Sequence, residues 1–205
     1  MLEAPQEFYD FYRIEEEIYN HEMREGQIIL DAGFGSGRLL RQLKLKAGSK
    51  IIGIDNSREM VERYSVELMA LPGVFVMYGD LNHTPFADGT FDIVIIGGAT
   101  FGNLAGKKKQ ALKEIKRILK PSGKILFSVY SEKSLPIRLE KYRNDPLEHK
   151  VSRKGTVYGL KNGQILISSE QYSPDKIQKI FKRCGGKNCK IIGETVLAYI
   201  IEGRF

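Results

Sequence analysis

The residues best suited to chemistry in this chain form a glycine-rich segment that follows an apolar run. The segment reads Asp31-Ala32-Gly33-Phe34-Gly35-Ser36-Gly37. Glycines adopt positive φ angles and let a ligand approach the backbone closely, and the start of a following helix offers free N–H groups. The segment therefore predicts a ligand site built on the backbone between a strand and a helix.

The spacing of the glycines distinguishes two classes of site. The dinucleotide-binding fingerprint needs Gly or Ala three residues after its second glycine, and Arg38 occupies that position. Here the third glycine, Gly37, comes two residues after Gly35, and Asp31 stands two residues before Gly33. This spacing disfavours a nicotinamide oxidoreductase, and it assigns no role to Arg38.

Three further motifs follow the glycine segment in order. Asp55 ends the apolar run 50–55, and Asp80 lies within Gly79-Asp80-Leu81. The last motif is residues 85–92, Pro-Phe-Ala-Asp-Gly-Thr-Phe-Asp, with Leu-Lys-Pro-Ser-Gly downstream at 119–123. We interpret Asp92 and Pro121 as turn and cap residues.

With these four motifs, the chain resembles the class I S-adenosylmethionine-dependent methyltransferases over about residues 27–130. Its core motifs are similar to those of ubiquinone and menaquinone biosynthesis methyltransferases. The resemblance implies a methyltransferase with S-adenosyl-L-methionine as its cofactor, the methyl donor. It also implies a Rossmann-like α/β three-layer sandwich, with a seven-stranded, mostly parallel sheet whose last strand is antiparallel.

The resemblance implies a role for each of the first three motifs, and it places Asp80 and Leu81 beside the adenine of the donor. Asp31 and the backbone of 33–35 hold the methionine end of the donor, Gly97 and Gly98 face its amino group and methyl, and Tyr9 on an N-terminal helix is a further candidate contact. Asp55 accepts from both ribose hydroxyls, because a carboxylate takes two donors at once and charge-assisted bonds are strong. The expected cofactor-binding residues are Asp31, Gly33, Phe34, Gly35, Asp55, Asn56, Asp80, Leu81, Gly97, Gly98 and Tyr9.

The order of the elements fits this fold. Apolar strands at 27–31, 50–55, 74–79, 91–97 and 124–130 alternate with helices at 5–25, 37–45, 58–71 and 107–119. Such alternation predicts a parallel sheet covered on both faces. We expect residues 120–123 to form a turn, and 190–192 and 195–202 to form two adjacent strands that close the sheet.

The segment 131–172 departs from this alternation. We expect 131–155, with Pro136 and Pro146, to be irregular, and 156–172 to form a hairpin that turns at Asn162-Gly163, which supplies positive φ angles. A helix then follows Ser173-Pro174. We expect one methyltransferase domain over 1–205, with 131–172 inserted as a lid over the substrate site.

The methyl acceptor should contact the parts not shared with the family: the N-terminal helix, 100–104 and the insertion. His83, Glu170 and Tyr172 are candidates to steer the acceptor or take its proton, and each has a structural or exposed role as its alternative. The fourth strand is not followed by the Asn-Pro-Pro-aromatic motif of many base methylases, which disfavours a nucleic-acid substrate. We therefore favour a small-molecule acceptor, an amine or a carboxylate-bearing compound.

Charge keeps two alternatives open. The net charge is +7, and residues 131–205 carry all of the excess, with 15 basic and 8 acidic side chains against 17 and 17 in residues 1–130. This region is a solvated face or a site for anions, so an RNA or protein methyltransferase is one alternative. The other is a non-catalytic S-adenosylmethionine-binding regulator or subunit.

Composition sets the remaining expectations. The start of the chain lacks a signal-peptide pattern, and the longest apolar runs, such as 93–96, are far shorter than a membrane span. We therefore expect a cytoplasmic protein without a membrane partner. Cys184 and Cys189 are interpreted as a reduced structural pair, and no metal is expected because the three histidines are scattered. No residue pattern predicts an oligomeric state.

Overall fold

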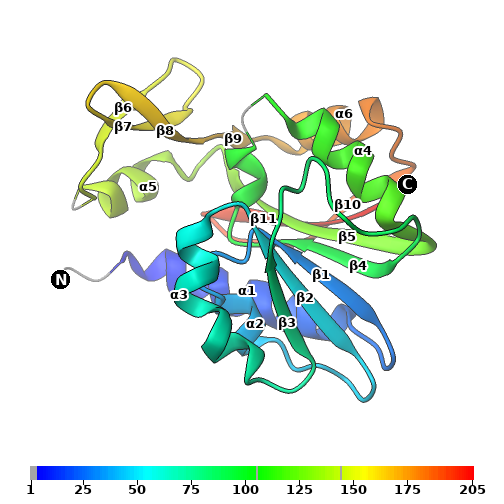
Figure 1. Cartoon of the computed structure of the whole chain (residues 1–205). Coiled ribbons are helices and arrows are strands. Elements are labelled where there is room, and N and C mark those ends of the chain that lie inside the picture. Colours follow the sequence, from blue (N-terminus) through cyan, green and yellow to red (C-terminus); the bar gives the residue numbers. More distant parts are fainter. Residues whose placement is uncertain (1–3, 105, 144) are drawn as a thin grey trace.

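A central sheet of eight strands runs through the computed structural model, which describes residues 4–104, 106–143 and 145–205 (Figure 1). Its order is β3-β2-β1-β4-β5-β11-β10, with β9 paired to β5. Strands β1 to β5 are parallel, and β11 runs antiparallel to both β5 and β10. The predicted fold is confirmed, with the short β9 as an addition. The strands of this sheet are β1 (Ile28–Ala32), β2 (Lys50–Asp55), β3 (Val74–Tyr78), β4 (Phe91–Ile96), β5 (Leu119–Ser131), β9 (Gln171–Tyr172), β10 (Asn188–Glu194) and β11 (Ala198–Arg204).

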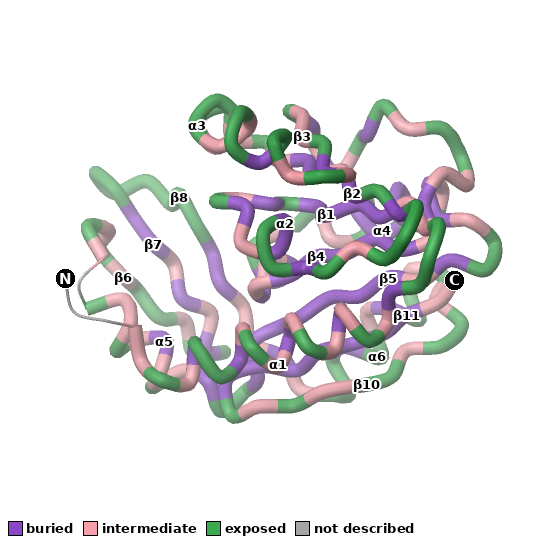
Figure 2. Tube along the Cα trace, turned by 90° about the horizontal axis from the view of Figure 1, so that it is seen from below, coloured by how far each residue is buried: buried purple, intermediate pink, exposed green. Residues whose placement is uncertain are grey.

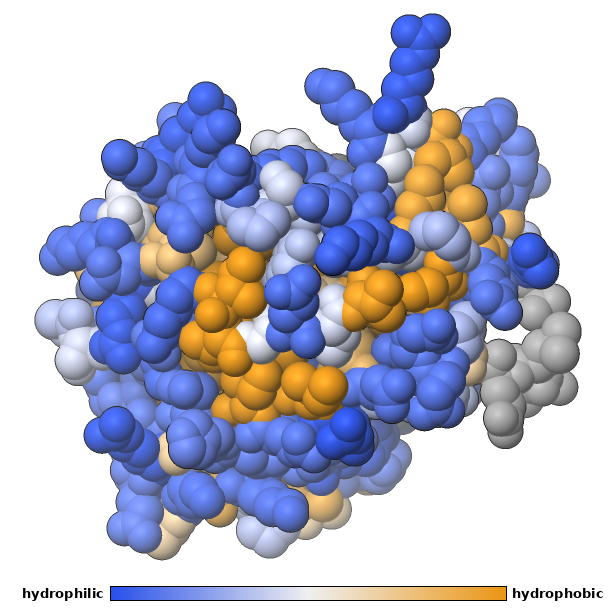
Figure 3. Space-filling model, turned by 180° about the vertical axis from the view of Figure 1, so that it is seen from behind, coloured by the Kyte–Doolittle hydropathy of each residue, from blue (hydrophilic) through white to orange (hydrophobic). Residues whose placement is uncertain are grey.

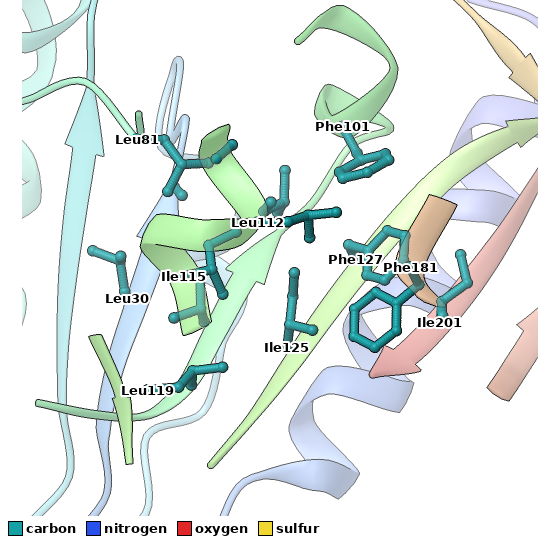
Figure 4. Packing of buried hydrophobic residues seen from close by; sticks show 14 of the residues in the cluster. Leu30, Leu81, Phe101, Leu112, Ile115, Leu119, Ile125, Phe127, Phe181 and Ile201 are labelled. Atoms are coloured by element: carbon teal, nitrogen blue, oxygen red, sulfur yellow. The ribbon is translucent and has the colours of Figure 1, made fainter. Parts of the chain in front are cut away.

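Helices cover both faces of the sheet, which gives the three layers. Helices α4 and α6 pack on one face, where Leu112 and Ile115 of α4 lie against Ile125 and Phe127 of β5 (Figure 4). Helices α1, α2 and α3 contribute to a second cluster on the other face. The bounds are α1 (Gln6–Glu22), α2 (Arg38–Gln42), α3 (Arg58–Met69), α4 (Lys108–Ile118) and α6 (Pro174–Arg183), with a 3₁₀ turn η1 (Thr100–Asn103) after β4.

Strand β5 illustrates why the core has two halves. Phe127 and Val129 belong to the cluster under α4, whereas Leu126 and Tyr130 belong to the cluster under α1. This alternation follows from the two-residue period of a strand. Buried residues therefore follow the central strands continuously, while the helices expose their outer sides (Figure 2). A strand that is buried on both faces has a nearly unbroken apolar sequence, and for this reason β5 could be predicted from the sequence.

The insertion between β5 and β9 is more regular than expected. It contains α5 (Leu135–Tyr142) and a separate sheet of β6 (Glu148–Val151), β7 (Val157–Lys161) and β8 (Gln164–Ser169). The expectation that 131–155 is irregular was wrong, because Pro136 lies in the first turn of α5, where a missing N–H is tolerated. The hairpin is confirmed: Asn162 and Gly163 have φ angles of 52° and 76° at its turn.

A buried arginine ties the insertion to the rest of the fold. Arg138 of α5 donates hydrogen bonds to the Ser169 carbonyl at 2.9 Å and to the Gly155 carbonyl at 2.8 Å. Its guanidinium carbon lies 4.9 Å from the centre of the Tyr130 ring on β5. Among the described residues, its hydrogen-bond acceptors are neutral oxygens, and burial lowers the pKa of Arg138. These contacts join α5, the small sheet and β5 into one packed unit.

The expected turn at 120–123 is instead a bulge inside β5. Helix α4 ends at Ile118, and the pairing of β5 with β4 passes from Leu119–Phe91 directly to Lys124–Ile93. Asp92 stabilises this region from within β4, because its carboxylate accepts the Ile28 N–H and the Lys120 ammonium, each at 2.8 Å. Asp92 is thus structural, as interpreted, although it lies in a strand and not in a turn.

The surface of the described residues is mixed. Seen from behind, the molecule carries a band of hydrophobic side chains among hydrophilic ones (Figure 3). Strand β8 contributes exposed apolar residues, Ile165, Leu166 and Ile167. Within the ranges that the structure describes, no helix is both long and apolar enough to cross a membrane.

Candidate functional site

The glycine segment forms a tight loop between β1 and α2. Gly33, Gly35 and Gly37 all have positive φ angles, 84°, 54° and 81°, a conformation that costs other residues energy. The Gly33 N–H donates to the Ile54 carbonyl at 2.7 Å, and the Gly35 N–H donates to the Asp55 carboxylate at 2.8 Å. The loop is therefore held by the end of β2, the strand beside it.

Two adjoining cavities open at the carboxyl ends of β1 to β4, the edge where ligands bind in parallel α/β sheets. Gly33 and Thr100 line both. The first, of about 250 Å³, is lined by predicted residues Asp55, Asn56, Asp80 and Leu81, and also by Gly79, Asn82, Asn103, Leu104 and Lys107. The second, of about 320 Å³, is lined by predicted residues Asp31, Phe34, Gly35, Gly97 and Gly98, and also by Tyr12, Ser36, Arg38 and Leu39.

Asp31 is the unusual group of the second cavity. Its side chain is 2% exposed, and its Oδ2 atom has no hydrogen-bond partner among the described residues. Burial raises the pKa of this carboxyl to about 7, while the Arg38 guanidinium acts in the opposite direction. A buried oxygen without a donor is costly. It is therefore suited to receive a cationic group from a ligand.

The two acids of the first cavity, unlike Asp31, accept hydrogen bonds from protein N–H groups. Asp55 accepts the N–H groups of Gly35 and Ser57, each at 2.8 Å, and its carboxylate has about four acceptor positions, so capacity remains for ligand hydroxyls. Asp80 accepts the backbone and side-chain N–H groups of Asn82 at 2.9 and 2.6 Å, which lowers its pKa. Both acids thus present ordered acceptors to a polar ligand.

An ion pair between α1 and α2 supports the second cavity, and the sequence did not indicate it. Glu15 of α1 is fully buried and accepts the Gly98 N–H at 2.9 Å and the Tyr19 hydroxyl at 3.2 Å. Its other oxygen pairs with Arg38, whose guanidinium lies 4.3 Å from the centre of the Tyr12 ring. The sequence does contain one indication of this ion pair: Glu15 is an acid on the face of α1 whose other buried residues are aromatic.

The N-terminal helix contributes Tyr12 to the cavity and not Tyr9. Tyr9 is 49% exposed and is absent from the lining of both cavities, whereas Tyr12 lines the second. The reason is the face that α1 buries, which contains Phe8, Phe11 and Glu15. Tyr12 flanks that face beside Arg38, and Tyr9 points away from it.

The three acceptor candidates do not converge on either cavity. His83 is exposed. Glu170 forms ion pairs with Lys108 at 2.7 Å and Lys176 at 3.2 Å, which lower its pKa against the effect of burial. Tyr172 is 1% exposed and packs near Phe101, with its hydroxyl unpartnered among the described residues. Their roles remain predictions, and for Glu170 the ion pairs favour the structural alternative.

Comparison with known proteins finds methyltransferases among the proteins that this chain resembles. A model described as a methyltransferase domain matches residues 29–123. A demethylmenaquinone methyltransferase of Staphylococcus aureus strain MRSA252 is 33% identical over 123 residues, 58% of this chain and 50% of the relative. An uncharacterised 37.1 kDa protein from a Streptomyces fradiae transposon is 34% identical over 116 residues, 56% of this chain and 33% of the relative. The chain thus spans half or less of the length of these curated relatives.

Solved structures share the fold over nearly the whole chain. A protein of Pyrococcus horikoshii OT3 has a TM-score of 0.70 at 21% identity and covers 94% of this chain and 89% of its own. A SAM-dependent methyltransferase from Aquifex aeolicus has a TM-score of 0.64 at 20% identity and covers 98% of both. These structures share the fold of this chain, while the matched domain model and the curated relatives support a likeness to the class I S-adenosylmethionine-dependent methyltransferases over about the first two thirds of the chain.

Proposed function

We propose that the chain is an enzyme that transfers the methyl group of S-adenosylmethionine to a small-molecule acceptor by in-line displacement. The observation that carries this proposal is the buried Oδ2 of Asp31, which has no partner in the described part of the chain and lies in a cavity that continues into one lined by Asp55 and Asp80. The donor offers an ammonium, a ribose diol and an exocyclic amine. These groups match the three acids in order.

The donor, when bound, supplies a methyl group already activated by a sulfonium. The chain would hold its ammonium at Asp31, its ribose hydroxyls at Asp55 and its adenine amine at Asp80. Glycine at 97 leaves room for the Leu39 side chain, since a Cβ there would stand 2.3 Å from Leu39 Cδ1 and that side chain would have to shift. The remaining task is to align the acceptor and exclude water. A general base is needed only for an acceptor that arrives protonated and weakly acidic.

The acceptor side of the site is proposed to lie between α1 and the insertion 131–172, which acts as its lid. Lys141 of α5 has its ammonium 4.1 Å from the centre of the Phe8 ring on α1, so the two elements are in contact. Tyr12 lines the donor cavity from the same helix. The name of the Staphylococcus aureus relative gives a small molecule as its acceptor, which favours this class over RNA or protein.

Calorimetric titration with S-adenosylmethionine and S-adenosylhomocysteine tests the donor, with NAD as the negative control. We expect saturable binding of both compounds and none of NAD. Asp55→Ala should abolish binding, and Asp80→Asn gives a second test because it leaves the Gly35 and Ser57 contacts in place. Absence of binding by the wild-type protein, or preferential binding of NAD, would overturn the proposal.

Formation of S-adenosylhomocysteine then tests the acceptor. Small amines, small carboxylic acids and total RNA are compared as acceptor pools, each at low and high salt. A small-molecule pool should support turnover. Turnover with RNA alone, falling steeply with salt, would instead establish the macromolecular alternative. Donor binding without turnover on any pool would favour a regulator or subunit.

A further inference from the structure

The outer sides of helices α4 and α6 form a surface that is rich in positive charge. Seven of its side chains are cations that are exposed and form no ion pair with any of the described residues. We propose that this surface, the basic face, is a docking site for the phosphate backbone of double-stranded RNA. The basic face consists of Lys109, Lys113 and Lys116 of α4, Lys179, Lys182 and Arg183 of α6, and Lys187.

The two helices present one continuous surface because they pack side by side on the same strand. Leu112 of α4 and Phe181 of α6 belong to one buried cluster over β5, and Figure 4 shows both near Phe127. The ammonium of Lys116 lies 3.3 Å from the position that a Cβ would take at Gly185, just past the end of α6. The cations of α4 therefore lie beside those at the end of α6.

Helix stability does not explain this arrangement of charges. Helix α4 begins with Lys108 and Lys109 and has no acid in its first turn, although the amino end of a helix favours negative charge. Lys109 and Lys113 are four residues apart, as are Lys179 and Arg183, and like charges at this spacing repel each other. The free protein thus retains a repulsion that a bound polyanion would relieve.

The chemistry of the basic face distinguishes among anionic partners. Neither α4 nor α6 exposes a large apolar side chain, whereas helices that attach to a bilayer surface bury an apolar face in it. For the same reason the basic face has no exposed aromatic ring on which unpaired bases could stack. Binding to the backbone of a double helix needs neither feature, because its affinity comes from phosphate contacts.

The dimensions of the basic face favour an RNA double helix over a DNA double helix. Lys109 and Lys116 are about 10 Å apart along α4, and packed helices lie about 10 Å from each other, so the cations form a compact patch. Two helices side by side are too wide to enter the major groove of DNA, which is about 12 Å across. The major groove of RNA is narrow and deep, so the phosphates of its two strands lie close together and match a compact patch of cations.

The basic face lies outside the proposed donor site. Lys107, which precedes α4, lines the first cavity, and Lys116 lies about 14 Å further along the helix. No cation of the basic face lines either of the two cavities. RNA bound here would therefore be a second partner, distinct from the methyl acceptor, and its binding does not depend on the donor.

The test measures binding of a labelled RNA duplex of about 20 base pairs by fluorescence anisotropy over a range of salt concentrations. The DNA duplex of the same sequence is measured in parallel, and sedimentation with vesicles that contain phosphatidylserine tests the bilayer. The double variant Lys113→Gln/Lys179→Gln removes two charges from the basic face. Its matched control, Lys44→Gln/Lys46→Gln, removes two charges from exposed positions elsewhere.

We expect the wild-type protein to bind the RNA duplex with a dissociation constant between about 1 and 100 μM at 0.1 M salt, the range of sequence-independent complexes. Lys113→Gln/Lys179→Gln should weaken binding by about 10- to 60-fold at this salt. It should also reduce the slope of log affinity against log salt by about 2, because each phosphate contact contributes about 0.9. The control should stay within about threefold of wild type, since salt screens charges that lie more than about 10 Å from the RNA.

Urea denaturation shows whether the variant folds, and its midpoint should not fall, because like-charge pairs are removed. If the variant does not fold, Lys109→Gln/Lys182→Gln replaces it. Equal weakening by the variant and by the control would overturn the inference, since net charge alone would then attract the RNA. Binding of the DNA duplex or of the vesicles that is as tight as binding of RNA would overturn the choice of partner. Absence of RNA binding by the wild-type protein would overturn the inference outright.

Discussion

Replacing Asp31 with asparagine should stabilise the ligand-free protein while destroying its site. Asp31 is almost completely buried, and its pKa is raised by burial from an ordinary value of 3.8 to about 7. Between these two values the unfolded chain has lost this proton while the folded chain keeps it. Stability therefore falls as the pH rises through this window. Asparagine removes the ionisation and with it the penalty.

The size of the effect follows from the two pKa values. Each pH unit within the window corresponds to about 1.4 kcal/mol. The penalty reaches about 4 kcal/mol at pH 8 and is between about 1 and 2 kcal/mol at pH 5. The buried amide introduces its own unsatisfied N–H, which costs about 1 kcal/mol at every pH. Asp31→Asn should then be more stable than wild type by about 3 kcal/mol at pH 8 and by about 1 kcal/mol or less at pH 5.

Urea denaturation of the ligand-free protein at pH 5 and pH 8 measures this difference, because a change in midpoint without a change in slope reports stability alone. Asp55→Asn is the matched control, and it should destabilise the protein because Asp55 accepts two backbone N–H groups. Affinity for S-adenosylhomocysteine should fall as the pH drops below about 7, by at most about tenfold per unit, and Asp31→Asn should bind weakly at both pH values. A stability change in Asp31→Asn that is the same at pH 5 and pH 8 would refute the reasoning.

Three further predictions concern the surroundings of the site. The pKa of Glu114 is lowered to about 2, chiefly by hydrogen bonds from Arg117. Glu114→Gln should therefore lower the free energy of unfolding by about 2 kcal/mol at pH 7. That cost should shrink as the pH falls from about 4.5 toward 2, as followed by urea denaturation at pH 7 and pH 3. Gly37→Ala should lower the free energy of unfolding by about 2 to 3 kcal/mol, because φ is 81° and the new Cβ would stand 2.6 Å from a leucine methyl. Gly35→Ala, with nothing within 4 Å, should lower it by only about 1 kcal/mol. Arg138→Ala should leave S-adenosylhomocysteine affinity unchanged but speed proteolysis within 131–172, because two buried carbonyls lose their donor.

The proposed donor site could be predicted from the sequence because it is built from strand ends. Asp31, Asp55 and Gly97 each lie at or next to the carboxyl end of an apolar run. Parallel strands bring these ends to one edge of the sheet. Once the alternation of strands and helices is recognised, the convergence of the motifs follows without knowledge of side-chain packing. That is why every predicted donor residue except Tyr9 lines one of the two cavities.

The supporting contacts could not be predicted in this way. Glu15 and Arg38 lie 23 residues apart on two different helices, and their meeting depends on how α1 packs against the sheet. Tyr9 and Tyr12 are three residues apart, so helical spacing alone did not decide which one reaches the cavity. Pro136 indicated irregular chain, although proline is also favoured in the first turn of a helix. In each case the sequence allowed two structures, and packing selected one of them.

The second cavity also contains a residue, Asp31, that lowers the stability of the ligand-free protein. A buried acid without a donor weakens the ligand-free protein, and an amide or apolar side chain at position 31 would be better tolerated. Meanwhile Glu15, one helix away, is satisfied by a backbone N–H, a hydroxyl and a guanidinium. The fold is therefore able to pair a buried acid fully in this region, and yet one oxygen of Asp31 has no partner among the described residues. The free energy lost there in the absence of ligand is recovered when a cation binds, so the unpaired oxygen favours binding of a positively charged group over an empty cavity.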